Sequence, residues 1–396
     1  MNELHSTDLL IVGAGPAGLA LALALAQAGI ASRLIEQEPV AGLASPPEDG
    51  RDIALTHRSR RILQKLGIWQ RLPEADIAPL REARVSNGGS PLVLPFDGRA
   101  DGHEALGWLV PNHRLRAAAH AAAAEAPGVS LIGDCRIVGF DRDARGATLQ
   151  AADGTRFTAP LVVAADSRFS TLRRMAGIGA RMLDFGRTAL VCRMSHEADH
   201  GGVAHECFRY GNTLAMLPMN GRHSSAVVTL RSDLVAEWQG LSDADFAGRI
   251  QEQLGSRLGA MAVAGARHAY PLVGVYASRF AGPRFALVGD SAVGMHPVTA
   301  HGYNFGLYGV EVLAAELARA RRLCRDLGEE APLRAYEREH RRTTLPIYLG
   351  TNAIVQLFTD DRGPARLLRG AVLRAAKGMP PLQALIARQL TGAGAR

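Results

Sequence analysis

Cysteine is scarce in this chain, which has four among 396 residues. They are Cys135, Cys192, Cys207 and Cys324, and no two share the CxxC spacing of zinc and redox sites. Reduced thiols, typical of a cytoplasmic protein, are therefore expected instead of a disulfide framework. We also find no Ser-His-Asp set and no cluster of metal ligands in the sequence, so neither triad hydrolysis nor a metal centre is predicted.

Long hydrophobic runs are few, and the one that stands out is "LLIVGAGPAGLALALALAQAGI" at residues 9–30. Three glycines and a proline fall in its first ten residues and no basic stretch precedes it, which argues against a membrane span or a signal peptide. We find no internal repeats and no Pro/Ser-rich linkers. With 47% apolar residues, the chain is long enough for two globular domains, or for one large domain with an inserted sheet.

Positive charge is concentrated at one end of a chain whose net charge is +7. Residues 362–396 contain seven Lys or Arg and no acid, while the rest of the chain carries 38 charges of each sign. Leucine, isoleucine and valine lie among those basic residues, a pattern typical of amphipathic helices at an anionic membrane surface. The alternative is a C-terminal helix packed on the body with its charges solvated. Nucleic acid is not an expected partner, because few aromatics accompany the basic residues.

The chain begins with a strand, a turn, a helix and a second strand. The apolar run "DLLIVGAG" ends at glycine, "PAGLALALALAQAGI" predicts a helix, and "SRLIEQ" predicts the next strand. A βαβ unit of this length implies a parallel sheet buried on both faces.

Alternating apolar and polar residues later in the chain predict a second, antiparallel sheet inserted into the first domain. The expected fold class is α/β, with a Rossmann-like domain, this inserted sheet and C-terminal helices. The expected division is 1–79, 106–180 and 276–345 for the nucleotide-binding domain, 80–105 and 181–275 for the inserted sheet, and 346–396 for a C-terminal helical basic segment.

The turn "GAGPAG" places Gly13, Gly15 and Gly18 in a GxGxxG frame. The first glycine allows a tight turn, the second lets the backbone approach a pyrophosphate, and the third lets helix and strand pack closely. Glu36 closes the second predicted strand, where a carboxylate can accept hydrogen bonds from ribose hydroxyls. The motif in this context predicts a bound adenine dinucleotide, against the alternative of a glycine turn needed only for packing.

A second glycine-rich stretch, "GDSAVGMHPVTAHGYNFGL" at residues 289–307, favours FAD over NAD. It follows an apolar strand, so Asp290 can accept hydrogen bonds from the ribityl hydroxyls of a long cofactor. A predicted helix begins near Gly302, and its N-terminal N–H groups would favour the negative charge of a reduced flavin ring.

Six segments share their order and spacing with one family, and they are distributed over nearly the whole chain: "GAGPAG", "GRDIALTHRSRRILQKLGIW", "LGWLVPNHRL", "AADSRFSTLRR", "ALVGDSAVGMHPVTAHGYNFGL" and "PPLQALIARQLTG". The chain thereby resembles the FAD-dependent aromatic hydroxylases of the para-hydroxybenzoate hydroxylase type, and within them the ubiquinone-biosynthesis hydroxylases. The stretch "HPVTAHG" is most similar to a subgroup that modifies more than one ring position.

The resemblance implies a set of cofactor-binding residues. By this resemblance the ADP half is bound near the first glycine turn, the pyrophosphate or ribityl region by Arg51 and Asp290, and the isoalloxazine by the second turn. The implied residues are Gly13, Gly15, Ala17, Gly18, Glu36, Arg51, Asn112, Arg114, Asp166, Asp290, Pro297, Gly302, Tyr303 and Asn304. The chain departs from the family pattern at three places: Ser167 stands for glycine, Val293 for histidine, and "TAHG" for "AGQG".

The resemblance also implies a mechanism in which NAD(P)H or another donor reduces FAD and O2 forms a flavin C4a-hydroperoxide. The distal oxygen is then transferred to an electron-rich ring. His301, His296 and Thr299 are the catalytic candidates, because a histidine can donate or accept a hydrogen bond to a phenolic hydroxyl near neutral pH. The alternative is that each histidine only fixes the loop.

The implied substrate is a polyprenylated precursor of ubiquinone, such as a demethoxyubiquinol or a polyprenylphenol. The implied location is cytoplasmic, with peripheral contact at the inner face of the cytoplasmic membrane and a ubiquinone-biosynthesis complex as partner. Three alternatives remain: a hydroxylase of a soluble aromatic compound, a flavin reductase that adds no oxygen, and a non-catalytic flavin-bound subunit of a biosynthetic complex.

Overall fold

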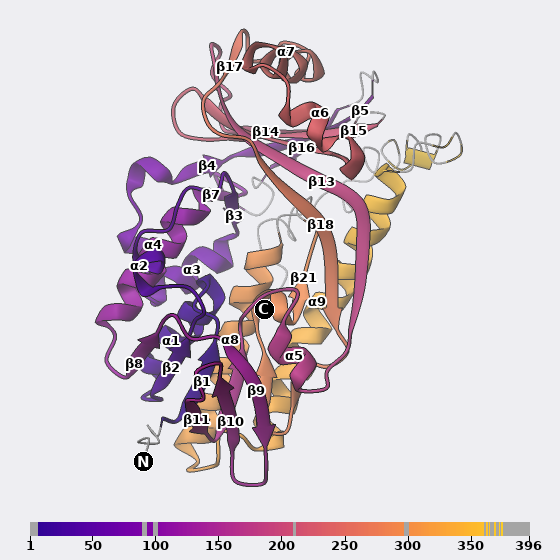
Figure 1. The fold of residues 1–396 in the computed structure, drawn as a ribbon. Coiled ribbons are helices and arrows are strands. Elements are labelled where there is room, and N and C mark those ends of the chain that lie inside the picture. Colours follow the sequence, from indigo (N-terminus) through magenta and orange to yellow (C-terminus); the bar gives the residue numbers. More distant parts are fainter. Residues whose placement is uncertain are drawn as a thin grey trace.

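The computed structural model describes residues 7–88, 93–97, 102–208, 211–296 and 301–359, together with 362, 364, 368, 369, 372 and 374. Figure 1 shows a body of sheets and helices that contains the N-terminal strands, and a large sheet at the opposite end of the molecule.

The first body contains a six-stranded sheet. Its order is β19 (Ala281–Gly282), β20 (Phe285–Leu287), β12 (Leu161–Ala164), β1 (Leu9–Val12), β2 (Ser32–Ile35) and β8 (Val129–Ile132). All neighbouring pairs are parallel except β19 with β20. Strand β12 is buried along its whole length, which explains its unbroken apolar sequence "LVVA". The predicted βαβ start and Rossmann-like sheet are confirmed.

Helices surround this sheet, and α1 packs against both α4 and α8. The helices of the first body are α1 (Pro16–Gln27), α2 (Val40–Ala44), α3 (His57–Lys65), α4 (Asn112–Glu125), α5 (Thr171–Met175), α8 (Gly302–Arg322) and α9 (Glu330–Thr359). Single turns of 3-10 helix add η1 (Trp69–Arg71), η2 (Glu74–Asp76) and η5 (Gly289–Ser291).

Two smaller sheets complete the first body. One has the order β11 (Arg156–Ala159), β10 (Ala147–Ala151), β9 (Ile137–Arg142). The other has the order β3 (Asp52–Leu55), β7 (Gly107–Pro111), β4 (Ala78–Leu80), and it lies between the helices and the large sheet (Figure 1).

The large sheet has nine strands. Its order is β21 (Val293–Gly294), β18 (His268–Ala277), β13 (Ala180–His196), β16 (His223–Arg231), β15 (Asn212–Pro218), β14 (Val203–Phe208), β5 (Glu82–Asn87) and β6 (Val93–Asp97), with β17 (Met261–Val263) beside β13. Its pairs are antiparallel except β14 with β5. The turn η4 (Ser232–Leu234) and the helices α6 (Val235–Gln239) and α7 (Asp243–Leu254) lie on its outer face (Figure 1).

Each body has its own hydrophobic core: one cluster fills the space around the six-stranded sheet, and another lies between the large sheet and α7. The division of the chain into domains stays a prediction. The large sheet draws most of its strands from residues 82–97 and 180–277, and it adds β21 from further along the chain. Helix α9 runs across the boundary expected at 346.

All four cysteines carry free thiols. Among the helices of the described residues, none has the length and apolar character needed to cross a bilayer. The basic C-terminal segment lies largely outside the described residues.

Candidate active site

The first glycine turn brings β1, α1 and β12 into close contact. Gly13 has a φ of +106°, and a Cβ there would lie 2.5 Å from the carbonyl oxygen of Ala165. A Cβ on Gly18 would lie 2.0 Å from the carbonyl oxygen of Gly13. These two positions therefore require glycine for close backbone packing.

The N-terminus of α1 faces open space. Gly15 caps the helix without a side-chain hydrogen bond, and the first turn contains no acid. A Cβ built on Gly15 would meet nothing within 4 Å. The free N–H groups of the first turn and the positive end of the helix dipole therefore suit a pyrophosphate.

Glu36 lies beside this turn at the end of β2. Its Oε2 accepts a hydrogen bond from the Ala14 N–H at 2.7 Å, and its Oε1 accepts from Gln37 at 2.8 Å. These bonds fix the carboxylate next to the turn, where it can also accept from a ribose hydroxyl.

Asp166 follows β12 and approaches the same turn. A Cβ on Gly13 would lie 2.8 Å from the Asp166 Cα. Burial raises the pKa of Asp166, and its Oδ1 is buried without a hydrogen-bond partner among the described residues. That oxygen can accept a bond from a cofactor hydroxyl. The neighbouring Ser167, which replaces the expected glycine, accepts a bond from the Phe169 N–H at 3.2 Å.

Asp49 joins two predicted cofactor residues that are 61 positions apart. Its Oδ2 accepts hydrogen bonds from Arg51 Nη2 at 2.6 Å and from Asn112 Nδ2 at 2.7 Å, and its backbone oxygen accepts from the Tyr270 hydroxyl at 2.5 Å. Burial alone would raise the pKa of Asp49, but the bonds and charge of Arg51 and the bond from Asn112 outweigh it, so the pKa is lowered. The carboxylate therefore stays ionised and orients both side chains. Sequence reasoning missed Asp49, although it stands two residues before Arg51.

Asp290, in η5, is held by Arg168, which belongs to the segment "ADSRFS" where Ser167 replaces the glycine of the family. Arg168 Nη2 donates to Asp290 Oδ2 at 2.9 Å, and Arg168 Nη1 donates to the carbonyl oxygen of Val273 on β18 at 3.2 Å. The side chain of Asp290 is 35% exposed, so it remains accessible beside η5. Sequence reasoning missed Arg168, because its partner lies 122 residues away.

Among the described residues, nothing closes the N-terminus of α8. His301 is the N-cap residue and forms no capping bond to the first turn, no acid lies in that turn, and a Cβ on Gly302 would meet nothing within 4 Å. Tyr303 has a buried hydroxyl without a hydrogen-bond partner among the described residues, and burial raises its pKa. This helix end suits a negatively charged ring.

Asn304 holds α8 against β3 and α3. Its Nδ2 donates to the carbonyl oxygen of Ala54 at 2.8 Å, and its Oδ1 accepts from the Thr56 N–H at 3.1 Å. The Asn304 amide therefore connects the first turn of α8 to two backbone groups of the β3–α3 connection.

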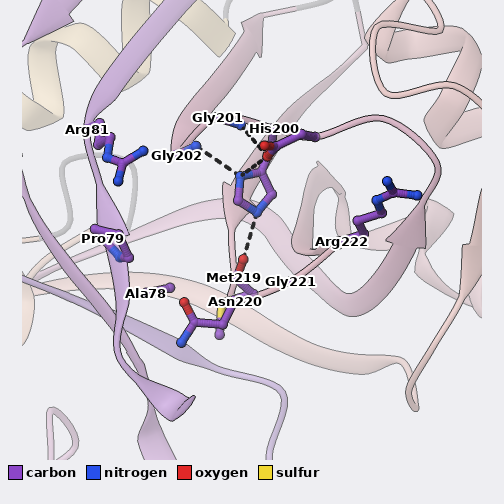
Figure 2. A pocket seen from close by; sticks show the side chains of 11 residues that line it. Ala78, Pro79, Arg81, His200, Gly201, Gly202, Met219, Asn220, Gly221 and Arg222 are labelled. Carbon is purple, nitrogen blue, oxygen red and sulfur yellow. Dashed lines mark hydrogen bonds and ion pairs between the residues drawn. The ribbon is translucent and has the colours of Figure 1, made fainter. Parts of the chain in front are cut away.

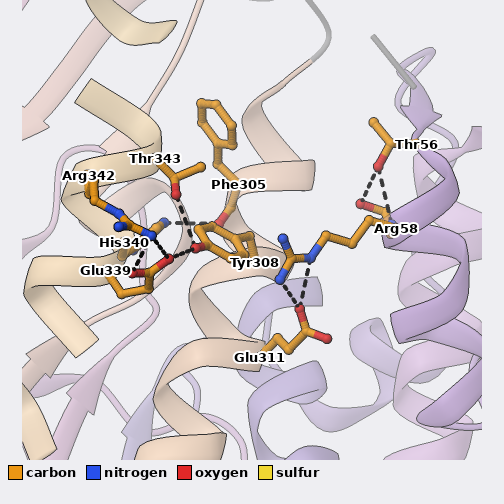
Figure 3. Close-up of polar contacts among 10 residues, drawn as sticks. Thr56, Arg58, Phe305, Tyr308, Glu311, Glu339, His340, Arg342 and Thr343 are labelled. Carbon is orange, nitrogen blue, oxygen red and sulfur yellow. Dashed lines mark hydrogen bonds and ion pairs between the residues drawn. The ribbon is translucent and has the colours of Figure 1, made fainter. Parts of the chain in front are cut away.

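Further along α8, polar contacts fix the helix from two sides (Figure 3). Arg58 of α3 forms an ion pair with Glu311 at 2.8 Å and lies over the ring of Tyr308 at 4.3 Å. The Tyr308 hydroxyl donates to Glu339 of α9 at 2.8 Å, and His340 Nε2 lies 3.2 Å from the carbonyl oxygen of Phe305. Helix α8 is thus held between α3 and α9.

Both candidate histidines are buried. His296 packs edge-on to Phe185 with ring centroids 4.8 Å apart, and burial, aided by the charge of Arg187, lowers its pKa to about 4. His301 lies against Phe305 at 5.2 Å. His296 is therefore neutral at physiological pH. The predicted residues Pro297 and Thr299 lie outside the described residues.

Two further positions come from the family resemblance: Arg114, a predicted cofactor residue, and Val293, where the family has histidine. Arg114 pairs with Asp76 of η2 at 2.9 Å and its side chain is half exposed. Val293, where the family has histidine, is buried in β21 and pairs with Tyr276 of β18.

A separate hollow of about 390 Å³ lies where β4 meets the β15–β16 turn (Figure 2). His200 there bonds the carbonyl oxygen of Met219 at 2.7 Å, and Arg81 and Arg222 lie on its walls. None of the predicted site residues lines it, so it is distinct from the candidate active site.

A family described as "FAD binding domain" matches residues 6–345. The chain is 45% identical to "Ubiquinone hydroxylase UbiM" of Neisseria meningitidis, over 98% of this chain and 85% of that protein. It is 38% identical to "Ubiquinone hydroxylase UbiL" of Rhodospirillum rubrum, over 97% and 89%, and 29% identical to "3-demethoxyubiquinol 3-hydroxylase" of Escherichia coli, over 94% and 95%.

Solved structures with a similar fold are more distant in sequence. The p-nitrophenol 4-monooxygenase PnpA of Pseudomonas putida has a TM-score of 0.78 at 18% identity, and covers 98% of both chains. PqsL, a probable FAD-dependent monooxygenase of Pseudomonas aeruginosa, has a TM-score of 0.77 at 20% identity, over 90% of this chain and 98% of that chain. At such identities the likeness concerns the fold alone.

Proposed function

Because this chain belongs to the FAD-binding-domain family, and within it to the ubiquinone-biosynthesis hydroxylases, we propose that it hydroxylates the aromatic ring of a polyprenylated ubiquinone precursor. It is an FAD-dependent aromatic-ring monooxygenase that uses O2, with NAD(P)H or another donor as reductant.

One observation supports the cofactor assignment: the first turns of two helices converge, and neither turn contains an acid. A Cβ on Gly289 of η5 would lie 2.9 Å from the Ala17 Cβ at the start of α1, and a Cβ on Gly306 of α8 would lie 3.4 Å from the Gly289 Cα. Two anion-attracting helix ends this close suit a long cofactor with a pyrophosphate in the middle and an anionic ring at one end. Asp290 lies between them, where it can accept bonds from ribityl hydroxyls.

We propose a role for each of these side chains, and their positions support it. When bound and reduced, FAD activates O2 and supplies one oxygen atom to an electron-rich ring. The N–H groups after Gly15 hold the pyrophosphate, Glu36 holds the ribose, and Arg51 is aimed by Asp49 towards the cofactor. The N-terminus of α8 stabilises negative charge on the ring system. His296, which is neutral at physiological pH, and His301 stay candidates for a hydrogen bond to a hydroxyl of the substrate, and so does Thr299.

We further propose peripheral contact with the inner face of the cytoplasmic membrane. Leu345, Leu349 and Ile354 of α9 are exposed by 36%, 48% and 46%, and the basic segment follows this helix. Exposed apolar side chains followed by positive charge suit an anionic lipid surface, where a polyprenylated substrate would be found. A partner from a ubiquinone-biosynthesis complex remains an expectation of the family resemblance.

Complementation tests the proposed function. The gene is expressed in bacterial strains that each lack one ubiquinone ring hydroxylase, and lipid extracts are analysed by mass spectrometry. We expect restored ubiquinone in at least one strain, and the rescued strains identify the ring positions. A Gly18→Val variant, unable to close the glycine turn, serves as the inactive control. No rescue by a protein that is expressed and yellow with FAD would favour a soluble aromatic substrate instead.

A further inference from the structure

The two faces of the large sheet have different surroundings. Cys207, Leu214 and Met216 point to the outer face, where they pack under α7 together with Phe246 and Ile250. Because side chains alternate along a strand, Glu206 of β14 points to the opposite, inner face, which faces the nucleotide-binding body (Figure 1).

On the inner face, the neighbours of Glu206 are covered by that body. Ser225 of β16 meets the Asp52 carboxyl of β3, and Leu217 of β15 packs with Leu109 of β7. Phe208, two residues from Glu206 on the same strand, packs at a tilt against Phe358 of α9 with ring centroids 4.5 Å apart.

Between these covered positions lies a row that is not covered. The strand register places Glu206 directly opposite Val85 on β5 and Ala215 on β15, and places Ala215 opposite Val227 on β16. All four residues keep part of their surface accessible, although Val85 also packs against the cluster that contains Phe208 and Phe358. The outer-face residues beside Glu206, Ala215 and Val227 are buried. The row is an apolar floor with one carboxylate in it.

Among the residues that the structure describes, none forms a hydrogen bond or ion pair with the Glu206 carboxyl, and burial raises its pKa to about 7. The charged groups of the adjoining strands, Glu82, Arg84 and His205, share the outer face by register. On the inner face, Asp52 and Arg193 lie near each other, at least two strands away. An unpaired carboxyl in such surroundings destabilises the fold, so a polar group from outside the described residues, such as a bound substrate, would stabilise it.

We propose that Glu206 is a catalytic residue that contacts the substrate and accepts the proton of its ring hydroxyl, while Val85, Ala215 and Val227 form the surface under the ring. This inference rests on the proposed function. The proton passes from the ring oxygen to a Glu206 oxygen, and the electron pair of the O–H bond stays on the ring oxygen. Electron density on the ring rises for attack on the oxygen atom that bound, reduced FAD would supply from O2, and the O–O bond breaks as the C–O bond forms. The attacked carbon loses its hydrogen as a proton, the second oxygen atom leaves as water, and Glu206 returns its proton to the ring oxygen.

The raised pKa of Glu206 brings it closer to the pKa of a phenol, which favours this proton transfer. A phenol titrates near pH 10, as tyrosine does, so a carboxylate of ordinary pKa is a poor acceptor for its proton. A carboxyl that titrates near neutral pH is a better base and is still ionised in part at pH 7.

The test is a single-turnover comparison of the FAD-loaded wild type with Glu206→Gln. The flavin is reduced chemically and then oxygenated, so that no donor protein is needed, and 2-allylphenol serves as a soluble substrate. We expect Glu206→Gln to bind FAD normally and to hydroxylate at least about 100-fold more slowly. The wild-type rate should rise with pH through about 7, and this inflection should be absent from the variant.

Two further variants separate chemistry from structure. Glu82→Gln, on the outer face of the neighbouring strand, should leave rate and pH profile unchanged, and Glu206→Asp should recover part of the rate. Difference spectra of bound 2-allylphenol should show phenolate with the wild type and not with Glu206→Gln. If Glu206→Gln has the rate and pH profile of the wild type, the inference about Glu206 is wrong while the proposed function stands. A yellow wild type that hydroxylates no phenol overturns the proposed function, and the inference with it.

Discussion

The glycines of the first turn, Gly13, Gly15 and Gly18, have different structural roles, and substitutions can test these roles separately. Gly18 contacts backbone, since its Cβ would lie 2.0 Å from the Gly13 oxygen, whereas Gly15 faces open space with an ordinary φ of −70°. Packing and cofactor binding are therefore assigned to neighbouring positions of the same turn.

We predict that Gly15→Ala leaves the stability of the FAD-free protein within about 0.5 kcal/mol of wild type, because the methyl group meets no protein atom. FAD affinity should fall at least about tenfold, since that methyl group occupies the space for the pyrophosphate. Thermal unfolding and flavin-fluorescence titration measure the two effects. Gly18→Ala, the matched control, should lose fold stability by roughly 3 kcal/mol. Normal FAD binding by Gly15→Ala would contradict the assignment of the pyrophosphate site.

A second single-residue prediction concerns Asp52, whose side chain is 2% exposed. Burial raises its pKa to about 6, against an unfolded value near 3.8. The protonated carboxyl therefore stabilises the fold fully below pH 4, and the free energy of unfolding falls as the carboxyl ionises while the pH rises through 6. Asp52→Asn should be more stable than wild type at pH 8, by about 3 kcal/mol, and this advantage should vanish near pH 4. Urea unfolding at both pH values checks it, and a constant difference between the two proteins would refute it.

At the scale of elements, the position of α8 is set by side chains rather than by helix propensity. Asn304 bonds two backbone groups of the β3–α3 connection, and Arg58 and Glu339 hold the helix further along. The N-terminus of α8 is therefore placed by contacts outside α8.

We predict that Asn304→Ala destabilises the protein by about 2–4 kcal/mol, because the Ala54 carbonyl and the Thr56 N–H are left buried without partners. FAD should bind more weakly as α8 shifts. Thermal unfolding and FAD titration measure both. Arg342→Ala, exposed on α9, is the control and should have little effect. If Asn304→Ala retained wild-type stability, the link between α8 and β3 would be unimportant.

The elements that sequence reasoning predicted are those with local signals. The βαβ start was predictable because the glycine frame, the helix and Glu36 lie within about 30 residues. Asp49, Arg168 and Glu206 were missed, since their importance depends on strand register or on partners far along the chain. Arg114 was proposed from resemblance, and its pair with Asp76 could not be read from spacing. The assigned site residues stay predictions.

At the scale of the whole molecule, acidification changes the free energy of unfolding in opposite directions through two kinds of buried group, histidines and carboxyls. Burial lowers the pKa of His205, His296 and His340 to about 4, so their contribution to stability is present above pH 6.5 and is lost as the pH falls through 4. Asp52 and Glu206 have raised pKa values, and they gain stability on acidification.

We predict that these five groups together reduce the unfolding free energy by only about 3 kcal/mol between pH 8 and pH 4, the effect of one uncompensated histidine. The double variant Asp52→Asn, Glu206→Gln lacks the compensation, so its loss on acidification should be two to three times larger. Urea unfolding of the FAD-saturated proteins across this range measures the slopes. Equal slopes would show that the two carboxyls do not titrate as described.

The convergence of α1, η5 and α8 also determines when the protein can acquire its cofactor during synthesis. About 280 residues separate the first glycine turn from Asp290. At translation rates of about 5–20 residues per second, the N-terminal turn leaves the ribosome tens of seconds before the other half of the site exists. Strand β1 also waits for β12, its parallel neighbour, which follows some 150 residues later. Flavin binding therefore marks chains whose translation is nearly complete, and a prematurely terminated chain has only half of the cofactor site.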